Sequence, residues 1–129
     1  MKMLEQEEEA DTEVTWEDQQ NINAFSRLHM RVQDLEALYE EKKKEKEYLD
    51  DLSSELELAD EDEPVKYRIG DAFVSLSLPA CQERLKNEQK TLTEELEGYS
   101  TKIDSLAEDM NKLKVLLYKK FGNSINLER

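Results

Sequence analysis

The side chains that could perform catalysis or bind a metal are few and widely separated. His29 is the only histidine and Cys81 the only cysteine, so no pair of nitrogen or sulfur ligands is available for zinc and no neighbouring base could activate the thiol. The acidic run ADEDE, at residues 59–63, lacks the glycine and the spaced oxygen ligands of a calcium loop. No glycine-rich phosphate loop is present. We therefore expect no catalytic site, no metal site and no cofactor.

Composition and charge indicate an elongated helical protein rather than a compact globular one. Of the 129 residues, 37% are hydrophobic and 39% are charged, which is little material for a globular core. The net charge of −14 would repel phosphate backbones and anionic lipid, so nucleic acid and membranes are not expected as partners. The sequence has no long apolar run, so we expect neither a transmembrane segment nor a signal peptide, and a single cysteine suits a reducing compartment. We expect a cytoplasmic protein, with the nucleus as a further location.

A first long helix is predicted over residues 15–59, after an acidic tail at residues 1–14 that we expect to be disordered. The hydroxyl of Thr15 can cap free backbone amides, and Glu17 and Asp18 follow where they face the positive end of the helix dipole. A stripe of residues in alternating steps of three and four then follows one side of the helix, as in a coiled coil. The stripe consists of Phe25, Leu28, Val32, Leu35, Tyr39, Lys42, Lys46, Leu49, Ser53 and Leu56.

A second long helix is predicted over residues 79–121. Pro79 is tolerated in a first helical turn, and Lys119 and Lys120 followed by Gly122 are typical of a helix end with a glycine cap. A short C-terminal tail, residues 122–129, follows. The second stripe consists of Leu85, Gln89, Leu92, Leu96, Tyr99, Ile103, Leu106, Met110, Leu113 and Leu117.

The two stripes match each other if the chain folds back between them. An antiparallel arrangement places Phe25 opposite Leu117 and Leu49 opposite Leu92, so stripe positions meet stripe positions along the whole length. Polar residues in the middle of both stripes predict a more flexible waist. The sequence thus favours an antiparallel intrachain coiled coil, although periodicity alone leaves open that each stripe pairs with another molecule.

Between the helices, an acidic turn at residues 60–64 leads into a predicted β-hairpin at residues 65–76. Gly70 and Asp71 fit a two-residue turn. A two-stranded hairpin is marginally stable alone and its bare edges invite pairing, so we expect several chains to combine their hairpins into a barrel. The predicted subunit interface, all on one side of the hairpin except Phe73, consists of Val65, Tyr67, Ile69, Ala72, Phe73, Val74 and Leu76. The alternative is that the hairpin only reverses the chain and folds onto its own helices.

Apolar residues beyond those of the stripes gather towards the two chain ends. A two-helix rod has a narrow seam, so residues away from that seam have little of their own chain to cover them. We expect a non-specific binding tip for unfolded chains, consisting of Trp16, Ile22, Phe25, Val115, Leu116, Tyr118, Phe121, Ile125 and Leu127, with Met30 nearby. Alternatively, Ile22 and Phe121 only cap the coiled coil, and the tail after Gly122 docks on the rod.

Three local stretches resemble a known family. VTWEDQQNIN at the first helix, DEPVKYRIGDAFVSL in the hairpin and LYKKFGNSINLE at the C-terminus together resemble the β-type subunits of prefoldin, over nearly the whole chain beyond the acidic tail. The resemblance implies a mainly α fold whose hairpin joins a multi-subunit β-barrel platform. It also implies a heterohexamer of two α-type and four β-type subunits. Gly98, in the middle of the second helix, departs from the helix-favouring residue expected there.

The resemblance further implies a function without catalysis. Prefoldin captures unfolded actin and tubulin through its coiled-coil tips without ATP and transfers them to the cytosolic chaperonin. We therefore expect a subunit of an ATP-independent chaperone. The alternative is a structural coiled-coil adaptor in a cytoskeletal or transcription-related complex, for which the rod would matter and the tip would not.

Overall fold

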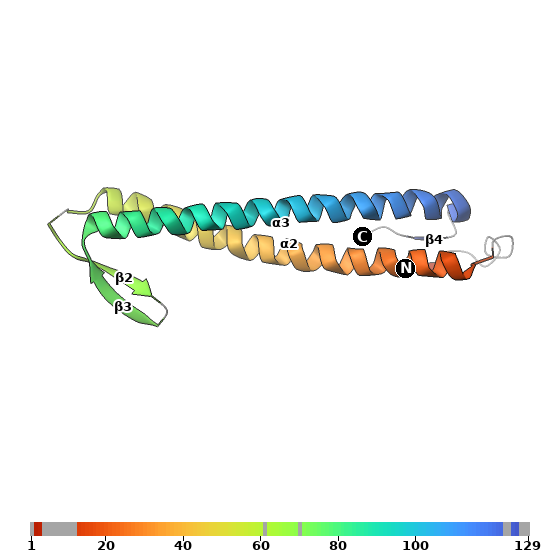
Figure 1. The fold of residues 1–129 in the computed structure, drawn as a ribbon, viewed down its shortest axis with the longest axis horizontal. Helices are drawn as coiled ribbons and strands as arrows, with labels where there is room; N and C mark the ends of the chain where they lie inside the picture. The colour runs from red at the N-terminus through yellow and green to blue at the C-terminus, as the bar shows by residue number, and fades with distance from the viewer. Residues whose placement is uncertain (1, 4–12, 61, 70, 123–124, 127–129) are drawn as a thin grey trace. The chain divides into compact units, whose positions relative to one another are not determined.

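The computed structural model describes residues 2–3, 13–60, 62–69, 71–122 and 125–126. The chain forms two compact units, which we call the terminal unit (residues 1–37 with 100–129) and the hairpin unit (residues 38–99). The elements in chain order are β1 (Lys2–Met3), α2 (Trp16–Glu57), β2 (Val65–Ile69), β3 (Ala72–Leu76), α3 (Leu78–Phe121) and β4 (Ile125–Asn126) (Figure 1).

The start of α2 is fixed by a reciprocal cap. The backbone N–H of Asp18 donates to Oγ1 of Thr15 at 3.1 Å, and the backbone N–H of Thr15 donates to Oδ2 of Asp18 at 3.0 Å. These two bonds satisfy amides that have no partner within the helix, which is the arrangement of a capping box. The predicted Thr15 cap is confirmed.

The two ends of α3 also follow the sequence signals. Ser77 precedes the helix, and its Oγ accepts a hydrogen bond from the N–H of Ala80 at 3.3 Å. At the far end, Gly122 adopts a φ of 59°, in the left-handed region that favours glycine and ends helices. The predicted glycine cap is therefore confirmed.

The β-hairpin has the predicted register. β2 and β3 pair antiparallel, with Val65 opposite Leu76, Tyr67 opposite Val74 and Ile69 opposite Ala72. Gly70, on which the predicted turn type depends, lies outside the described residues. Side chains alternate between the two sides of a strand pair, so this register determines which residues share a side.

In each unit, the stripes of α2 and α3 pack against each other within the same chain. In the terminal unit the buried cluster is formed by Phe25, Val32, Met110, Leu117 and Phe121. In the hairpin unit it is formed by Leu49, Leu56, Tyr67, Leu78, Cys81, Leu85 and Leu92. The prediction of a mainly helical protein with two long helices, an intrachain helix pair and a hairpin between the helices is confirmed.

The terminal unit also contains a short sheet that the sequence did not predict. β1 and β4 pair antiparallel, with Lys2 opposite Asn126 and Met3 opposite Ile125. The predicted disordered tail at residues 1–14 falls mainly on residues 4–12, which lie outside the described residues. Lys2 and Met3 are too few for a periodic pattern, so pairing between two distant segments gave no signal in the sequence.

Candidate functional site

Several large apolar side chains of the terminal unit are exposed to solvent. Trp16, at the first position of α2, is 75% exposed, and Met30 on the same helix is also largely exposed. On α3, the neighbouring residues Val115 and Leu116 are 61% and 52% exposed. None of the four belongs to the buried cluster of Phe25 and Leu117 or to the partly buried residues packed against it. They give the terminal unit an apolar surface available to another molecule.

The other residues predicted for the tip are not equally available. Phe25 and Phe121 belong to the buried cluster, so the structure places them in the core rather than on the surface. Ile22 and Tyr118 are partly buried and pack against that cluster. A stripe position is covered by the opposite helix, which explains the burial of Phe25. Ile125 lies in β4, and Leu127 lies outside the described residues.

An ion pair joins the two helices of the terminal unit at the end where α2 begins. The Lys120 ammonium group, in the last turn of α3, donates to the carboxylate of Asp18 in the first turn of α2. Together with the hydrogen bond from the Thr15 backbone, this contact lowers the pKa of Asp18 below its ordinary value. The helix end that presents Trp16 is thus held by charge as well as by packing.

In the hairpin unit, the predicted interface residues fall into two groups. Tyr67 is 6% exposed, and Val65 and Leu76 are partly buried, because all three pack against the cluster formed by α2 and α3. Phe73 is 68% exposed, and Ala72 and Val74 are also exposed. Ile69 ends β2.

The hairpin is therefore covered by its own helices at one end and left open at the other. Tyr67 is covered by its own chain, since the first turns of α3 contribute Leu78, Cys81 and Leu85 to the same buried cluster. The alternative that the hairpin folds onto its own helices thus applies to this end of the hairpin.

Tyr67 is also held by two charged residues of α3. The guanidinium of Arg84 lies 5.4 Å from the centre of the Tyr67 ring, within the range of a cation–π interaction. Burial, together with a hydrogen bond to Glu88, raises the pKa of Tyr67 to about 12. Burial likewise raises the pKa of the neighbouring Cys81 thiol, so this cysteine is protected rather than reactive. Helical periodicity gave no signal for Arg84 or Glu88, because neither lies on the apolar stripe.

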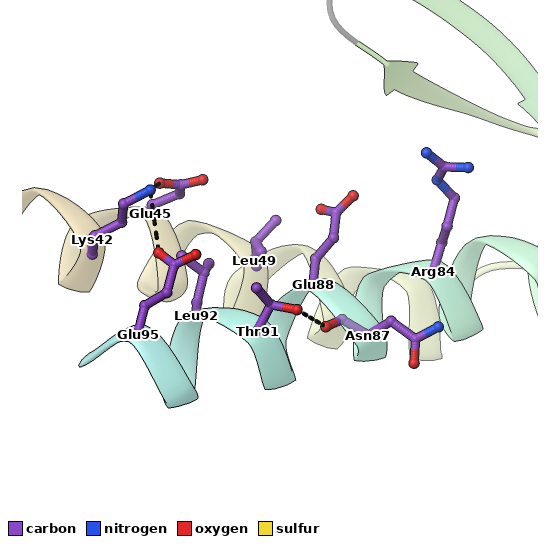
Figure 2. Close-up of a pocket in the computed structure, with 9 residues that line it drawn as sticks. All are labelled: Lys42, Glu45, Leu49, Arg84, Asn87, Glu88, Thr91, Leu92 and Glu95. Carbon is purple, nitrogen blue, oxygen red and sulfur yellow. Dashed lines mark hydrogen bonds and ion pairs between the residues drawn. The ribbon is translucent and has the colours of Figure 1, made fainter. Parts of the chain in front are cut away.

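Arg84 and Glu88 also line a groove of about 330 Å³ on the hairpin unit (Figure 2). At its other end, the Lys42 ammonium lies 3.4 Å from the Glu95 carboxylate and 3.6 Å from that of Glu45. These carboxylates raise the pKa of Lys42, Glu45 contributing most. The groove has the character of an ion-paired helix surface; its lining consists of Lys42, Glu45, Leu49, Arg84, Asn87, Glu88, Thr91, Leu92 and Glu95.

A polar contact joins the helices where the sequence indicated a weak seam. Nε2 of Gln89 donates to Oδ1 of Asp50 at 2.7 Å, and Nζ of Lys46 donates to Oδ2 of Asp50 at 3.0 Å. The two bonds lower the pKa of Asp50, Lys46 contributing most. Gln89 and Lys46 are the polar stripe positions, and Asp50 supplies the acceptor that the stripe pattern did not include.

The described residues give no indication of a metal centre or of a membrane span. Within the part of the chain that the structure describes, no three or more His, Cys, Asp or Glu side chains converge into a group that could hold a metal ion. None of the helices in the described ranges has a sufficiently long apolar stretch to cross a membrane. His29 is partly buried on α2, and its Nδ1 has no hydrogen-bond partner among the described residues.

Comparison with known proteins decides the family. A family model described as "Prefoldin subunit" matches residues 19–124, which include both long helices almost entirely and the whole hairpin. The chain belongs to the prefoldin subunit family. It is 42% identical to prefoldin subunit 4 of Saccharomyces cerevisiae over 129 residues, covering 100% of both chains. It is also 42% identical to prefoldin subunit 4 of Homo sapiens over 119 residues, covering 92% of this chain and 89% of the human one.

The fold agrees with this assignment. The structure resembles the crystal structure of the prefoldin beta subunit from Thermococcus strain KS-1, with a TM-score of 0.78, 15% identity, and coverage of 86% of this chain and 97% of that one. The resemblance to a β-type prefoldin subunit is thus confirmed, and the relatives at 42% identity are named prefoldin subunit 4. Prefoldin subunits are components of a chaperone that assemble with other prefoldin subunits, and they are not known as enzymes. This agrees with the prediction of a non-enzymatic protein.

Proposed function

We propose that this chain is a subunit of a hexameric chaperone, with two α-type and four β-type subunits, that captures unfolded actin and tubulin and transfers them to the cytosolic chaperonin. The proposed site of action is the cytoplasm, with the nucleus as a second location. The observation that carries the proposal is the exposure of Trp16, Met30, Val115 and Leu116 on the terminal unit of a prefoldin subunit.

The proposed mechanism is hydrophobic capture followed by passive release. An unfolded chain exposes apolar segments, and covering apolar surface contributes roughly 25 cal/mol per Å² removed from water. A few exposed side chains on one subunit therefore give a weak contact. Several subunits holding the same client would give a much stronger one through avidity. No covalent step and no nucleotide is needed, because binding energy alone holds the client.

The types of the exposed side chains suit clients of varied sequence. Trp16 offers a large, rigid apolar surface, and the unbranched side chain of Met30 adapts to irregular partners. Neither requires a fixed pattern of hydrogen bonds in the client. A binding surface of this kind would accept unfolded segments of many sequences while discriminating against folded proteins, which bury such segments.

The matched pair Trp16→Ser and Tyr48→Ser tests this proposal. Both residues are aromatic, lie on α2 and are mostly exposed, at 75% and 66%, but Trp16 is in the terminal unit and Tyr48 in the hairpin unit. Each variant is assembled with the other prefoldin subunits, and assembly is verified by native mass spectrometry. Denatured actin is then diluted into each complex without ATP, and its aggregation is followed by light scattering.

We expect the Trp16→Ser complex to protect actin less well than the wild type, and the Tyr48→Ser complex to protect it equally well. Adding Val115→Ser and Leu116→Ser should reduce protection further, by about threefold to tenfold in all. Equal protection by the triple variant and the wild type would contradict the proposed client surface. Full protection combined with unchanged assembly would instead favour the coiled-coil adaptor, for which the terminal unit carries no client.

A further inference from the structure

We propose that Tyr67 is a positioning residue for assembly: it anchors the hairpin on the first turns of its own α3 and leaves the half with Ala72 and Phe73 for a neighbouring prefoldin subunit. This inference rests on the proposed function, in which the hairpin joins other subunits. We call the contacts of Tyr67 with α3 the hairpin anchor; they are made with Leu78, Cys81, Arg84, Leu85 and Glu88.

The first argument for the anchor is the depth of burial at this one position. Tyr67 lies in the middle of β2, which pairs with β3 in a two-stranded sheet. Such a hairpin is only marginally stable by itself. Yet Tyr67 is 6% exposed, and Cys81 in the same buried cluster is 1% exposed. The hairpin unit therefore supplies cover to one aromatic residue of the hairpin, and this cover ties the strands to the helix that follows them.

The second argument is that contacts with α3 fix the orientation of the Tyr67 side chain in addition to burying it. Arg84 covers the ring at 5.4 Å, while Glu88, one helical turn further along α3, contacts the hydroxyl. Both side chains project from α3 on the side on which the hairpin strands are drawn (Figure 2). Burial of a phenylalanine would need neither partner. The combination of a ring contact and a hydroxyl contact fixes how β2 sits on α3.

The third argument is the contrast with the open half of the same hairpin. Phe73 is 68% exposed and Ala72 is also exposed, and the outer edges of β2 and β3 have no partner strand among the described residues. An unpaired edge beside exposed apolar side chains favours pairing with a strand of another chain. Membership of the prefoldin family makes the hairpin of another prefoldin subunit the occupant we assign.

The anchor has a consequence for assembly. A hairpin that moved freely would have to be ordered when a neighbour binds, and that ordering would weaken binding. A hairpin already held by Tyr67 presents its open half in one orientation. Removing the anchor should therefore slow assembly, although Tyr67 itself is covered by its own chain and does not contact the neighbour.

The thiol of Cys81 reports on the anchor in the isolated full-length chain. It is the only cysteine and is buried in the same cluster as Tyr67, so its reaction with Ellman's reagent measures how often the anchor opens. We expect slow modification in the wild type and a rate about tenfold higher in Tyr67→Ala, with Tyr67→Phe between them because it keeps the ring contacts and loses the hydroxyl contact. Phe73→Ala, on the open half of the hairpin, serves as the control and should react as slowly as the wild type.

Amide hydrogen exchange separates release of the hairpin from simple uncovering of the thiol. If Tyr67 anchors the hairpin, the amides of residues 65–69 and 72–76 exchange faster in Tyr67→Ala, while those of the terminal unit keep the wild-type rate. Unchanged exchange in the hairpin would overturn the proposal even if the thiol reacts faster, since the ring would then only cover Cys81. A wild-type thiol that reacts like an unfolded peptide would overturn it as well.

Assembly is measured separately, by mixing each variant with the other prefoldin subunits and following complex formation by native mass spectrometry. We expect Tyr67→Ala to assemble more slowly than the wild type and Tyr67→Phe to be largely rescued. Equal assembly rates for Tyr67→Ala and the wild type would contradict the positioning role. Failure of the wild type to assemble would instead contradict the proposed function, while the thiol and exchange results on the isolated chain would still decide whether the anchor exists.

Discussion

The carboxylate of Asp18 in the first turn of α2 is paired with the ammonium group of Lys120 in the last turn of α3. Each charge lies at the helix end whose dipole it complements, the anion at an N-terminus and the cation at a C-terminus. The same carboxylate accepts the hydrogen bond from the Thr15 backbone that completes the cap of α2. One side chain therefore both starts a helix and joins it to the end of the other.

Replacing Asp18 should cost stability in a pH-dependent way. The pairing lowers the pKa of Asp18 in the folded chain, so its contribution is present above the unfolded value near 3.8 and is lost as the pH falls through the folded pKa. We expect Asp18→Asn to melt at a lower temperature than the wild type at pH 7, and the difference to shrink below about pH 4. Thermal melts followed by circular dichroism measure this, with Glu17→Gln as the control. A difference that stays constant down to pH 2 would contradict the role of the carboxylate charge.

Two neighbouring leucines of α3 should differ strongly in how much their truncation lowers stability. Leu117 is 1% exposed in the core of the terminal unit, whereas Leu116 is 52% exposed. Leu117→Ala leaves a cavity and should lower the free energy of unfolding by about 2–4 kcal/mol, whereas Leu116→Ala should change it by less than about 0.5 kcal/mol. Urea denaturation of both variants measures the contrast. Similar losses for the two would show that the helix pair is packed differently.

The two glycines associated with α3 should differ in the sign of their effect. Gly98 lies inside the helix, and a Cβ added there would meet no atom within 4 Å, so Gly98→Ala should stabilise the chain by up to about 1 kcal/mol. Gly122 has a positive φ that an L side chain rarely adopts, so Gly122→Ala should destabilise it by about 1 kcal/mol. Thermal or urea denaturation measures both. Destabilisation by Gly98→Ala would indicate that this position has a packing partner.

The phenol of Tyr67 should contribute stability that is lost at high pH. Its pKa is raised to about 12 in the folded chain from an ordinary value of 10.0, so the contribution is complete below pH 10 and is lost as the pH rises to about 12. Over that window the wild type should lose on the order of 2 kcal/mol more than Tyr67→Phe, which has no group to ionise. Urea denaturation at pH 9, 10.5 and 12 measures the two curves. Parallel curves would contradict the buried, hydrogen-bonded phenol.

The sequence predicted the parts of the fold that depend on local pattern. The cap at Thr15 and the glycine end at Gly122 follow from backbone chemistry that needs only neighbouring residues. The register of the hairpin, with Tyr67 opposite Val74, follows from the position of a two-residue turn. The helix pair was predictable because matching residues of the two stripes lie at equal sequence separations from the hairpin.

Contacts between distant residues outside those patterns were not predictable. The anchor of Tyr67 depends on where the first turns of α3 place Arg84 and Glu88. That placement is set by the packing of the hairpin on the helix, and the apolar periodicity of the sequence does not predict it. The bond between Gln89 and Asp50 likewise joins a stripe position to a residue beside the stripe. Periodicity identifies which residues face a seam, but it does not identify polar partners along its border.

The candidate binding surface was predictable in part for the same reason. Trp16, Val115 and Leu116 lie off the stripe and are exposed. Phe25 and Phe121 also lie near the chain ends, but the structure places both in the core. A stripe position such as Phe25 packs against the opposite helix. Whether a residue lies on the stripe therefore predicts its burial better than its distance from the chain ends does.

Assembly with other prefoldin subunits is the central claim, and the mass of the intact complex tests it most directly. The full-length chain is given an affinity tag and expressed in cells, and the complex that contains it is purified and weighed by native mass spectrometry. We predict a mass that corresponds to six chains, composed of this chain and other prefoldin subunits of α and β type. An intact complex that contains this chain and no other prefoldin subunit would contradict the account.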